Sequence, residues 1–600
     1  MRYKLSAALL SAACTHAYAV VNETLPDIVV TATRTAQSAD ATLASVSIIT
    51  RQDIARLQAQ SLPDVLRGVA GLTISNSGGA GKATSVFLRG TNSDHVLVLV
   101  DGIKVGSATT GTASFQDIPV AQIDRIEIVR GPRASLYGSE AIGGVIQIFT
   151  RKGGGALTPS FSATAGSYGT FNGAFGLSGG GEQGWFNFKL NQQNTKGFNA
   201  KRNATGADLD KDGYHNSSLG LNGGYRFDNG VVADAQVLRA NNKNMFDGNP
   251  NQSEGVQQVL GGSLKFAPLQ AWNMILRAGS GQDYSNNFLN GVFKSRFNTQ
   301  RDSLSWQNDF ALDADQLFTA GLDYQNDRVD STTAYTRPTR DNRALFGQYQ
   351  GNFGAHSLQA SLRRDDNQQF GGHTTTGLGY GYALSDMTRL TASYGTAFKA
   401  PTFNSLYYPG FGNSALRPEL SRSIEAGVAG YGTFGKWSVN AYQTKVENFV
   451  VYDATFTPVN IELARINGLE GQLQTQLADW DINGTLTLQD PRNQVATNHQ
   501  GKLLNRRATE AMRIEVAHDL GAYRFASSLY AEGRRFDDIG NTQHLGGYGL
   551  LDVRAEYRVT AGWLVQGRID NLLDKRYETA QFYNQARRGL YFTLNYQSKN

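Results

Sequence analysis

From about Gly155 to its end, the chain repeats one pattern of alternating apolar and polar residues, interrupted by clusters of Gly, Asn and Asp. Segment 551–559 shows this pattern without a break, because its odd-numbered residues are all apolar and its even-numbered residues are all charged. Successive side chains of a β-strand point to opposite faces, so each run predicts a strand with one apolar and one polar face. The alternation alone does not decide whether the apolar faces cover a soluble sandwich core or face lipid.

The length of the pattern decides between these two architectures. A sandwich would require ~450 residues of uninterrupted antiparallel sheet, whereas a closed barrel has no edges and turns apolar residues to lipid and polar residues to its lumen. At ~20 residues for a strand with its share of the loops, the pattern gives slightly more than twenty strands. The last run, 590–596, alternates as a closing strand should. The composition agrees, since only 18% of the residues are charged, against ~25% in soluble proteins.

The first residues have the form of an export signal. Arg2 and Lys4 precede an apolar run over 5–13, and Ala17-Tyr18-Ala19 matches a signal-peptidase site. We therefore expect residues 1–19 to be a signal peptide. A lipoprotein anchored through Cys14, the only cysteine, is the alternative, but the residues before it match a lipoprotein signal poorly. The net charge of +5 is small for 600 residues and does not indicate a nucleic-acid partner.

The first 150 residues differ in kind from the rest. Two capping boxes, at 50–53 and 61–64, each predict the start of a short helix. Short apolar strands are predicted at the four segments 86–88, 96–100, 123–129 and 145–149. These elements indicate a small mixed α/β domain. Because an open barrel of this size would leak, we expect the small domain to fill the lumen as a plug.

The sequence gives no support for catalysis. The eight His residues show no metal-ligand spacing such as H-E-x-x-H, and no Ser-His-Asp arrangement can be assembled. The run Gly79 to Lys82 resembles part of a phosphate-binding P-loop, but Asn76 and Ala83 stand where that motif needs Gly and Ser or Thr. We interpret this run as an exposed loop of the plug and expect no enzyme activity.

Several motifs resemble the family of TonB-dependent outer-membrane receptors. Those of the plug are 125–133 (RIEIVRGPR) and 137–145, and those of the barrel are 398–401 (FKAP), 416–419 and 571–575. Further plug motifs, 51–54, 64–67, 89–92 and 95–99, are most similar to the cobalamin-transporting members. The resemblance covers the chain from about Pro26 to its end. It implies an all-β membrane protein, a 22-stranded antiparallel transmembrane β-barrel with an N-terminal mixed α/β plug domain inside the lumen.

The resemblance also implies the domain boundaries and the surroundings of the protein. We expect a signal peptide at 1–19, an N-terminal extension at 20–34 that contains the TonB box at 26–33, a plug at 35–152 and a barrel at 153–600. The location implied is the bacterial outer membrane, where the barrel contacts lipid. We expect a monomer, with no nucleic-acid partner.

The function implied is TonB-dependent active import of cobalamin, in which cargo binds on the extracellular loops of plug and barrel. TonB, energised by the inner-membrane proton gradient, pulls from the periplasm on a box that can add as a strand to a partner sheet. The expected TonB box is Pro26, Asp27, Ile28, Val29, Val30, Thr31, Ala32 and Thr33. The cobalamin-contacting positions of the family fall on Ala83, Ser85, Asn92, Thr110, Gly111 and Arg507.

Two other functions are weighed against this one. A receptor for a ferric siderophore or another metal chelate would have the same architecture and the same energy source. A passive pore or a barrel enzyme would differ, but the plug and the TonB box argue against a pore, and the missing catalytic residues argue against an enzyme.

The run Asp208 to Gly213 is the strongest candidate for a metal site. In an extended segment residues two apart point the same way, so Asp208, Asp210 and Asp212 converge, and hard oxygen ligands suit calcium. The alternative is a solvated turn, because Asp and Gly are common in turns. The resemblance implies a loop-ordering calcium ion and the full ligand set Asn199, Asp208, Asp210, Asp212, Phe246 and Asp247. Asn199 is neutral where the family has an acidic residue, and Glu254 is a candidate for a last acidic ligand.

Overall fold

The computed structural model describes residues 29–30, 34–35, 37–38, 40–453, 455–495 and 499–598. No helix within these ranges is long and apolar enough to cross a membrane. The predicted signal peptide lies outside the described residues. So do the following residues of the predicted TonB box: Pro26, Asp27, Ile28, Thr31, Ala32 and Thr33.

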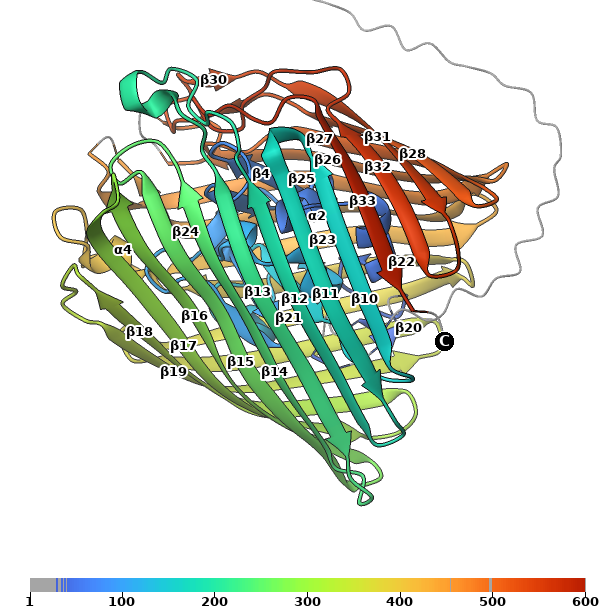
Figure 1. The fold of residues 1–600 in the computed structure, drawn as a ribbon. Coiled ribbons are helices and arrows are strands. Elements are labelled where there is room, and N and C mark those ends of the chain that lie inside the picture. Colours follow the sequence, from blue (N-terminus) through green and yellow to red (C-terminus); the bar gives the residue numbers. More distant parts are fainter. Residues whose placement is uncertain are drawn as a thin grey trace, which may run out of the picture.

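Twenty-two antiparallel strands form one closed barrel, which confirms the predicted fold (Figure 1). Closure is made by the first and last barrel strands, where Phe161 pairs with Tyr596 and Ala165 pairs with Phe592. The strands are β10 (Thr158–Gly166), β11 (Thr170–Gly180), β12 (Gly184–Thr195), β13 (Tyr214–Arg226), β14 (Val232–Met245), β15 (Gln252–Leu269), β16 (Trp272–Leu289), β17 (Val292–Ala311), β18 (Gln316–Ser331), β19 (Thr339–Phe353), β20 (His356–Asn367), β21 (Gly371–Ser385), β22 (Thr388–Lys399), β23 (Glu419–Gly432), β24 (Gly435–Tyr452), β25 (Pro458–Leu477), β26 (Trp480–Asn493), β27 (Glu510–Leu520), β28 (Tyr523–Glu532), β31 (Tyr548–Arg558), β32 (Trp563–Asp570) and β33 (Gly589–Gln597).

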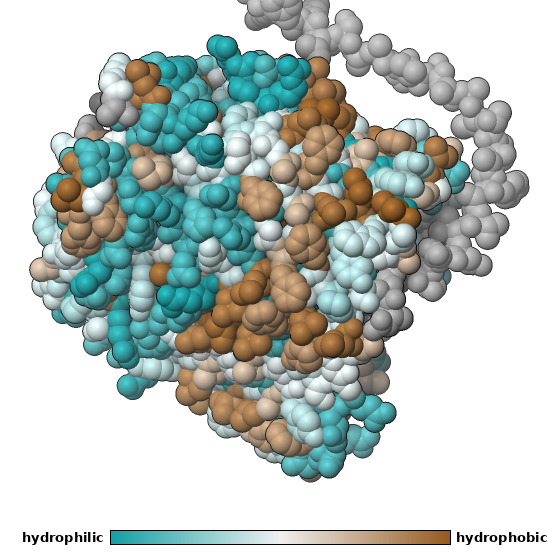
Figure 2. Space-filling model, in the orientation of Figure 1, coloured by the Kyte–Doolittle hydropathy of each residue, from teal (hydrophilic) through white to brown (hydrophobic). Residues whose placement is uncertain are grey.

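The alternation predicted from the sequence separates the two faces of the wall. In β20, Leu362 is 55% exposed on the outer face, whereas its neighbour Arg363 is 2% exposed and faces the lumen. In β31, Arg554 is buried and pairs with Glu515 at 3.1 Å. The outward side chains form an apolar band across the visible face of the barrel, with polar regions above and below it (Figure 2).

The two ends of the barrel differ in the length of their connections. Short turns such as 227–231 and 559–562 join the strands at one end. At the other end lie long loops, and one of them, 400–418, carries the helix α4 (Phe403–Tyr407). Another, 533–547, carries the small hairpin β29 (Arg535–Phe536) and β30 (His544–Leu545). In outer-membrane barrels short turns are periplasmic and long loops extracellular, which orients the molecule.

The plug lies inside the barrel, as the blue segment of Figure 1 shows. Its main sheet has the order β3-β8-β9-β6-β7, in which β6 and β9 are parallel. The two predicted capping boxes are both present, with Thr50 on Asp53 and Ser61 on Asp64. The strands are β1 (Val29–Val30), β2 (Gln37–Ser38), β3 (Val46–Ile49), β4 (Leu72–Asn76), β5 (Thr84–Leu88), β6 (Val96–Val100), β7 (Ile103–Val105), β8 (Ile123–Arg130) and β9 (Gly144–Thr150). The helices are α1 (Arg51–Leu57), α2 (Leu62–Leu66) and α3 (Ala134–Tyr137), with 3-10 turns η1 (Ser93–His95), η2 (Phe115–Asp117) and η3 (Val120–Gln122) in the plug and η4 (Ser167–Gly169) and η5 (Gly206–Leu209) in the barrel loops.

The apolar core of the plug lies mostly within the plug itself, around side chains such as Leu62, Ile126 and Ile148. Many contacts between the plug and the barrel wall are polar, and they include a buried network of ion pairs. Arg89 donates to both Glu425 of β23 and Glu470 of β25, with four nitrogen–oxygen distances of 2.9 Å. Arg130 adds an ion pair to Glu470 at 3.1 Å. In this network the plug supplies the cations and the wall supplies the carboxylates, so the charges of each are balanced only when the plug is in place.

We predict that depth sets the cost of a charge on the outer face of β31. Val553→Arg should lower the free energy of unfolding of the barrel by ~2–4 kcal/mol, because Val553 lies within the strand on the outer face, which we expect to contact lipid. Val559→Arg, at the same face but in the turn 559–562 and 48% exposed, should cost only ~0–1 kcal/mol. Urea unfolding in lipid vesicles measures both. Equal costs at the two positions would mean that this face does not span the apolar core of the bilayer.

We also predict that Arg89→Met destabilises the plug by ~3–5 kcal/mol, because it leaves a carboxylate buried without its cation. Glu425 would keep a hydrogen bond from the Ser45 hydroxyl and the more distant charge of Arg133. The matched control is Lys436→Met, which removes an exposed plug–barrel pair with Asp40 and should cost ~0–1 kcal/mol. Hydrogen exchange of plug amides measures both opening free energies. The network is not what holds the plug if Arg89→Met leaves the exchange of β6 and β9 unchanged.

Candidate functional site

Three connections of the plug reach the end of the barrel that carries the long loops. They are 77–83, 89–95 and 106–113, and they contact barrel loops at each point. Where β4 leads into the first, Asn76 donates its backbone N–H to the Thr579 hydroxyl at 2.9 Å. All predicted cargo positions of the plug lie on these connections or on β5. Ala83 and Thr110 are exposed, and Ser85, Asn92 and Gly111 are half-buried.

Two predicted cargo residues that lie far apart in sequence touch each other. Nη2 of Arg507 donates to Oδ1 of Asn92, and its Nε donates to the Gly90 carbonyl at 3.1 Å. The guanidinium also lies 4.6 Å from the centre of the Phe87 ring. Arg507 is 3% exposed, and burial lowers the pKa of Arg507 to about 9. In this conformation Asn92 is therefore the accessible member of the pair, and Arg507 positions it from behind.

The third connection is covered by the loop 400–418. Asn404 of α4 donates its backbone N–H to the Thr109 carbonyl at 3.0 Å, and a Cβ added at Gly111 would lie 2.8 Å from Thr402 Cγ2. Beyond α4 the loop carries Tyr408 and Phe411, and Phe411 is 46% exposed. The sequence did not single out this loop, although its run of aromatic residues after 398–401 was a signal that could have found it.

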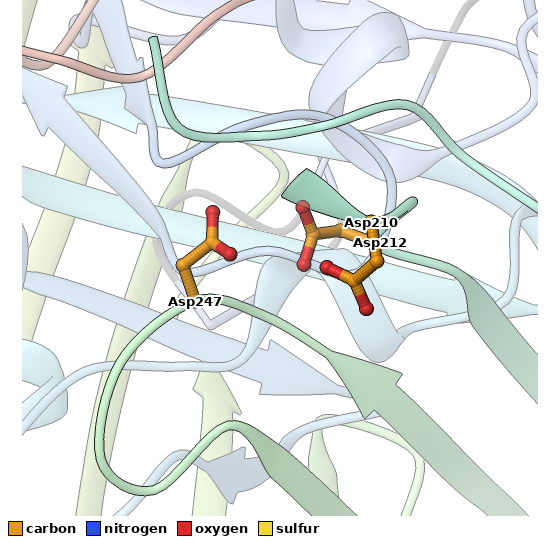
Figure 3. Close-up of side chains that lie close together, drawn as sticks. All are labelled: Asp210, Asp212 and Asp247. Carbon is orange, nitrogen blue, oxygen red and sulfur yellow. The ribbon is translucent and has the colours of Figure 1, made fainter. Parts of the chain in front are cut away.

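Three of the predicted metal ligands meet at this end of the molecule (Figure 3). Asp210, Asp212 and Asp247 each offer a carboxylate oxygen, and these oxygens lie within 4.8 Å of one another. Asp247 Oδ2 is buried and has no hydrogen-bond partner among the described residues. Calcium prefers hard oxygen donors of this kind, so the residues present fit a calcium ion.

Other candidate ligands are engaged elsewhere. Asp208 pairs with Lys201 at 3.2 Å, and its carbonyl accepts a hydrogen bond of 2.8 Å from the Asn199 side chain. The side-chain oxygen of Asn199 accepts from the Lys201 backbone at 2.9 Å. Glu254 pairs with Lys243 at 3.2 Å on the surface. The geometry therefore brings together part of the predicted set and not Asn199, Asp208 or Glu254.

The acidic cluster is crowded with negative charge. Burial, together with the neighbouring Asp212, Asp208 and Asp210, raises the pKa of Asp247 to about 6. Burial also raises the pKa of Asp212. Phe246 precedes Asp247 in the same loop and could contribute only its carbonyl oxygen. A cation at this point would relieve the repulsion between the carboxylates.

At the opposite end, the described part of the predicted TonB box already forms a strand. Val29 pairs with Ser38 and Val30 with Gln37, which joins β1 to β2. Directly after the box, Arg34 forms a bidentate ion pair with Asp323 of β18. Its Nη1 and Nη2 donate to the two carboxylate oxygens at 3.2 and 2.8 Å. Its guanidinium also lies 4.2 Å from the ring centre of Phe346 on β19. This anchor to the inner wall was not predicted, and only its place next to the box could have suggested it.

Comparisons with known proteins cover nearly the whole chain. Residues 38–145 match the model of the TonB-dependent receptor plug domain, and residues 151–572 match that of the TonB-dependent receptor-like β-barrel. A vitamin B12 transporter, BtuB, of Photobacterium profundum is 33% identical over 95% of both chains, and one of Vibrio cholerae is 34% identical over 99% of both.

Solved structures agree on the fold. A mutant of the ferric enterobactin receptor PfeA from Pseudomonas aeruginosa superposes with a TM-score of 0.80, at 17% identity over 92% of this chain and 98% of that one. The ferric yersiniabactin receptor FyuA from Yersinia pestis gives 0.78, at 18% identity over 94% and 99%. With plug and barrel matched in order, and with relatives of equal length at a third identity, the chain belongs to the family of TonB-dependent receptors.

Proposed function

We propose that this receptor imports cobalamin by TonB-dependent transport across the bacterial outer membrane. The family is one of receptors rather than enzymes, and it implies an outer-membrane location and a TonB partner. Two observations support cobalamin as the cargo. Relatives that match over nearly their full length are named vitamin B12 transporters. The predicted cargo residues Asn92 and Arg507 also meet at the extracellular end of the plug, and this contact carries the proposal.

A ferric siderophore or another metal chelate is the second candidate cargo. It is favoured by the solved structures, whose titles name siderophore receptors. Their identity to this chain is 17–18%, so they support the same fold but do not indicate the same ligand. We therefore keep this cargo as the outcome that a binding experiment must exclude.

The steps of import follow from where the residues lie. Cargo would dock on the plug loops that carry Ala83, Asn92 and Thr110, next to the loop 400–418. On the periplasmic side, β1 would leave β2 and add to a sheet edge of TonB, since main-chain hydrogen bonds can be exchanged between partners. The Arg34–Asp323 ion pair would be the first described wall contact that pulling reaches, ahead of the hydrogen bonds of Thr35 and Gln37 with Gln350. We propose that the barrel acts as a monomer in contact with outer-membrane lipid.

We further propose a loop-ordering calcium ion. Asp210, Asp212 and Asp247 would hold it, with Asn199, Asp208 and the Phe246 carbonyl as the remaining predicted ligands. When bound, the ion would neutralise the carboxylates and join the loops 196–213 and 246–251. A surface ordered in advance loses less entropy when cargo docks, so calcium would tighten cargo binding, and cargo would tighten calcium equally.

We predict that a proline in the TonB box separates transport from binding. Val29→Pro should abolish uptake and leave surface binding of cobalamin intact, because proline removes a strand donor and fixes φ far from the cargo site. Val29→Ala, which keeps the N–H, is the control and should transport normally. Uptake of labelled cobalamin by cells measures both. Import at the normal rate by Val29→Pro would show that the box or the energy source is misassigned.

We predict that the purified receptor binds cobalamin and not ferric enterobactin, and that calcium tightens cobalamin binding by roughly 5- to 150-fold, the usual size of such couplings. Titration with and without a chelator measures this. The double variant Asp210→Ala, Asp212→Ala should lose the calcium effect. Asp228→Ala, which removes an exposed carboxylate from the short turn 227–231 at the other end, should keep it.

Two results would contradict these assignments separately. Tighter binding of the ferric siderophore than of cobalamin would identify the alternative cargo. An unchanged cobalamin affinity in the presence of chelator would show that the aspartates are solvated turn residues rather than calcium ligands.

A further inference from the structure

A lysine is buried in the plug loop next to the acidic cluster. Lys82 is 2% exposed, although it lies in the connection 77–83 at the extracellular end. Its Nζ donates three hydrogen bonds, to the Ala80 carbonyl at 3.0 Å, the Asp212 carbonyl at 3.1 Å and the Asn244 side-chain oxygen at 2.9 Å. None of these acceptors is a carboxylate oxygen. Lys82 thus has no ion pair within the part of the chain that the structure describes, and burying a cation in this way is costly, so its position calls for a function beyond stability.

The three hydrogen bonds of Lys82 join two separate parts of the molecule. Ala80 belongs to the plug, whereas Asp212 lies in the barrel loop 196–213 and Asn244 in β14. The side-chain carboxylate of Asp212 belongs to the acidic cluster, whereas its backbone carbonyl accepts a hydrogen bond from Lys82. Asp212, Asp117 and Asp247 all stabilise the charge of Lys82 electrostatically.

Glycine residues allow the plug loop to approach the barrel loop closely. A Cβ added at Gly81 would lie 1.9 Å from Tyr214 Cδ2, and one at Gly79 would lie 2.9 Å from the Phe198 ring. Gly81 also has a φ of +74°, in the left-handed region that favours glycine. The loop is therefore shaped to bring Lys82 against the segment that carries the aspartates.

We propose that Lys82 is a positioning residue that couples the calcium site to the cargo surface of the plug. Fixing Asp212 at the ion would fix its carbonyl, and through Lys82 the loop that carries Ala83. The inference rests on the calcium site and the cargo of the proposed function. It goes beyond them because it assigns the path of the coupling to one side chain of the plug.

Lys82→Met should preserve the affinity for calcium and abolish the effect of calcium on cobalamin binding. Calcium alone should bind at least as tightly as in the wild type, because a cation near the carboxylates is removed. Cobalamin affinity should no longer depend on calcium, so the roughly 5- to 150-fold effect should fall below about twofold. A loss of stability alone would weaken both affinities and would not produce this split. Calorimetric titration with calcium, with cobalamin in calcium and with cobalamin in chelator gives these three affinities for each variant.

The matched control is Lys201→Met. Lys201 is also a cation beside the cluster, paired with Asp208 at 3.2 Å, but its side chain is 38% exposed and lies on the barrel loop. This variant should tighten calcium and keep the calcium dependence of cobalamin binding. A second test is Asn244→Ala, which removes the acceptor on β14 and leaves every charge in place. It should reduce the coupling even if Lys82→Met does not assemble.

The outcomes distinguish the inference from the function on which it rests. Wild-type coupling retained in Lys82→Met, or in Asn244→Ala if the former does not fold, overturns the role of Lys82. An equal loss of coupling in Lys201→Met overturns it as well, because charge rather than the link to the plug would then be the cause. If wild-type protein shows no calcium effect, the calcium site itself fails, and the role of Lys82 fails with it.

Discussion

The closure of the sheet between β10 and β33 is the constraint on which the rest of the molecule depends. Within a bilayer no water can satisfy a free strand edge, so every backbone group must find its partner in the wall. The pairing of Phe161 with Tyr596 and of Ala165 with Phe592 meets this requirement. A ring of 22 strands is too wide for its own side chains to fill. The lumen therefore needs a folded domain, and the wall that surrounds this domain must be polar.

A polar wall changes how two domains hold together. The plug keeps most of its apolar side chains in its own core and also meets the barrel through directional contacts, among them the buried pairs of Arg89 with Glu425 and Glu470. Arg301 of β17 with Glu140 of the plug is another, at 2.7 Å. Such contacts fix register as well as distance. They place the plug loops against the barrel loops accurately enough for the buried Arg507 to hold Asn92 from behind.

The sequence predicted the local features and missed those that depend on register. Alternation gave the strands, as in 551–559, and the capping boxes at Thr50 and Ser61 gave the helix starts. For the acidic run, spacing by two holds for Asp210 and Asp212 but not for Asp208, because the 3-10 turn Gly206–Leu209 interrupts the extended segment. Asp247 joins the cluster only through the pairing of β13 with β14. The resemblance to the receptor family implied that Asp247 is a ligand. Neither that resemblance nor the residue pattern predicted that Lys82 is buried.

The pair between Arg34 and Asp323 differs from an ordinary buried ion pair in what remains after it opens. Asp323 also accepts hydrogen bonds from Arg363 and, at 2.7 Å, from the Ser305 hydroxyl. If Arg34 departs towards the periplasm, its charge enters water and the carboxylate keeps a second cation. Breaking a buried pair is expensive chiefly because it strands one charge, and here none is stranded. Opening this anchor therefore transfers Arg34 to water and leaves the wall with a paired carboxylate, so it costs less than opening a pair that leaves a buried charge alone.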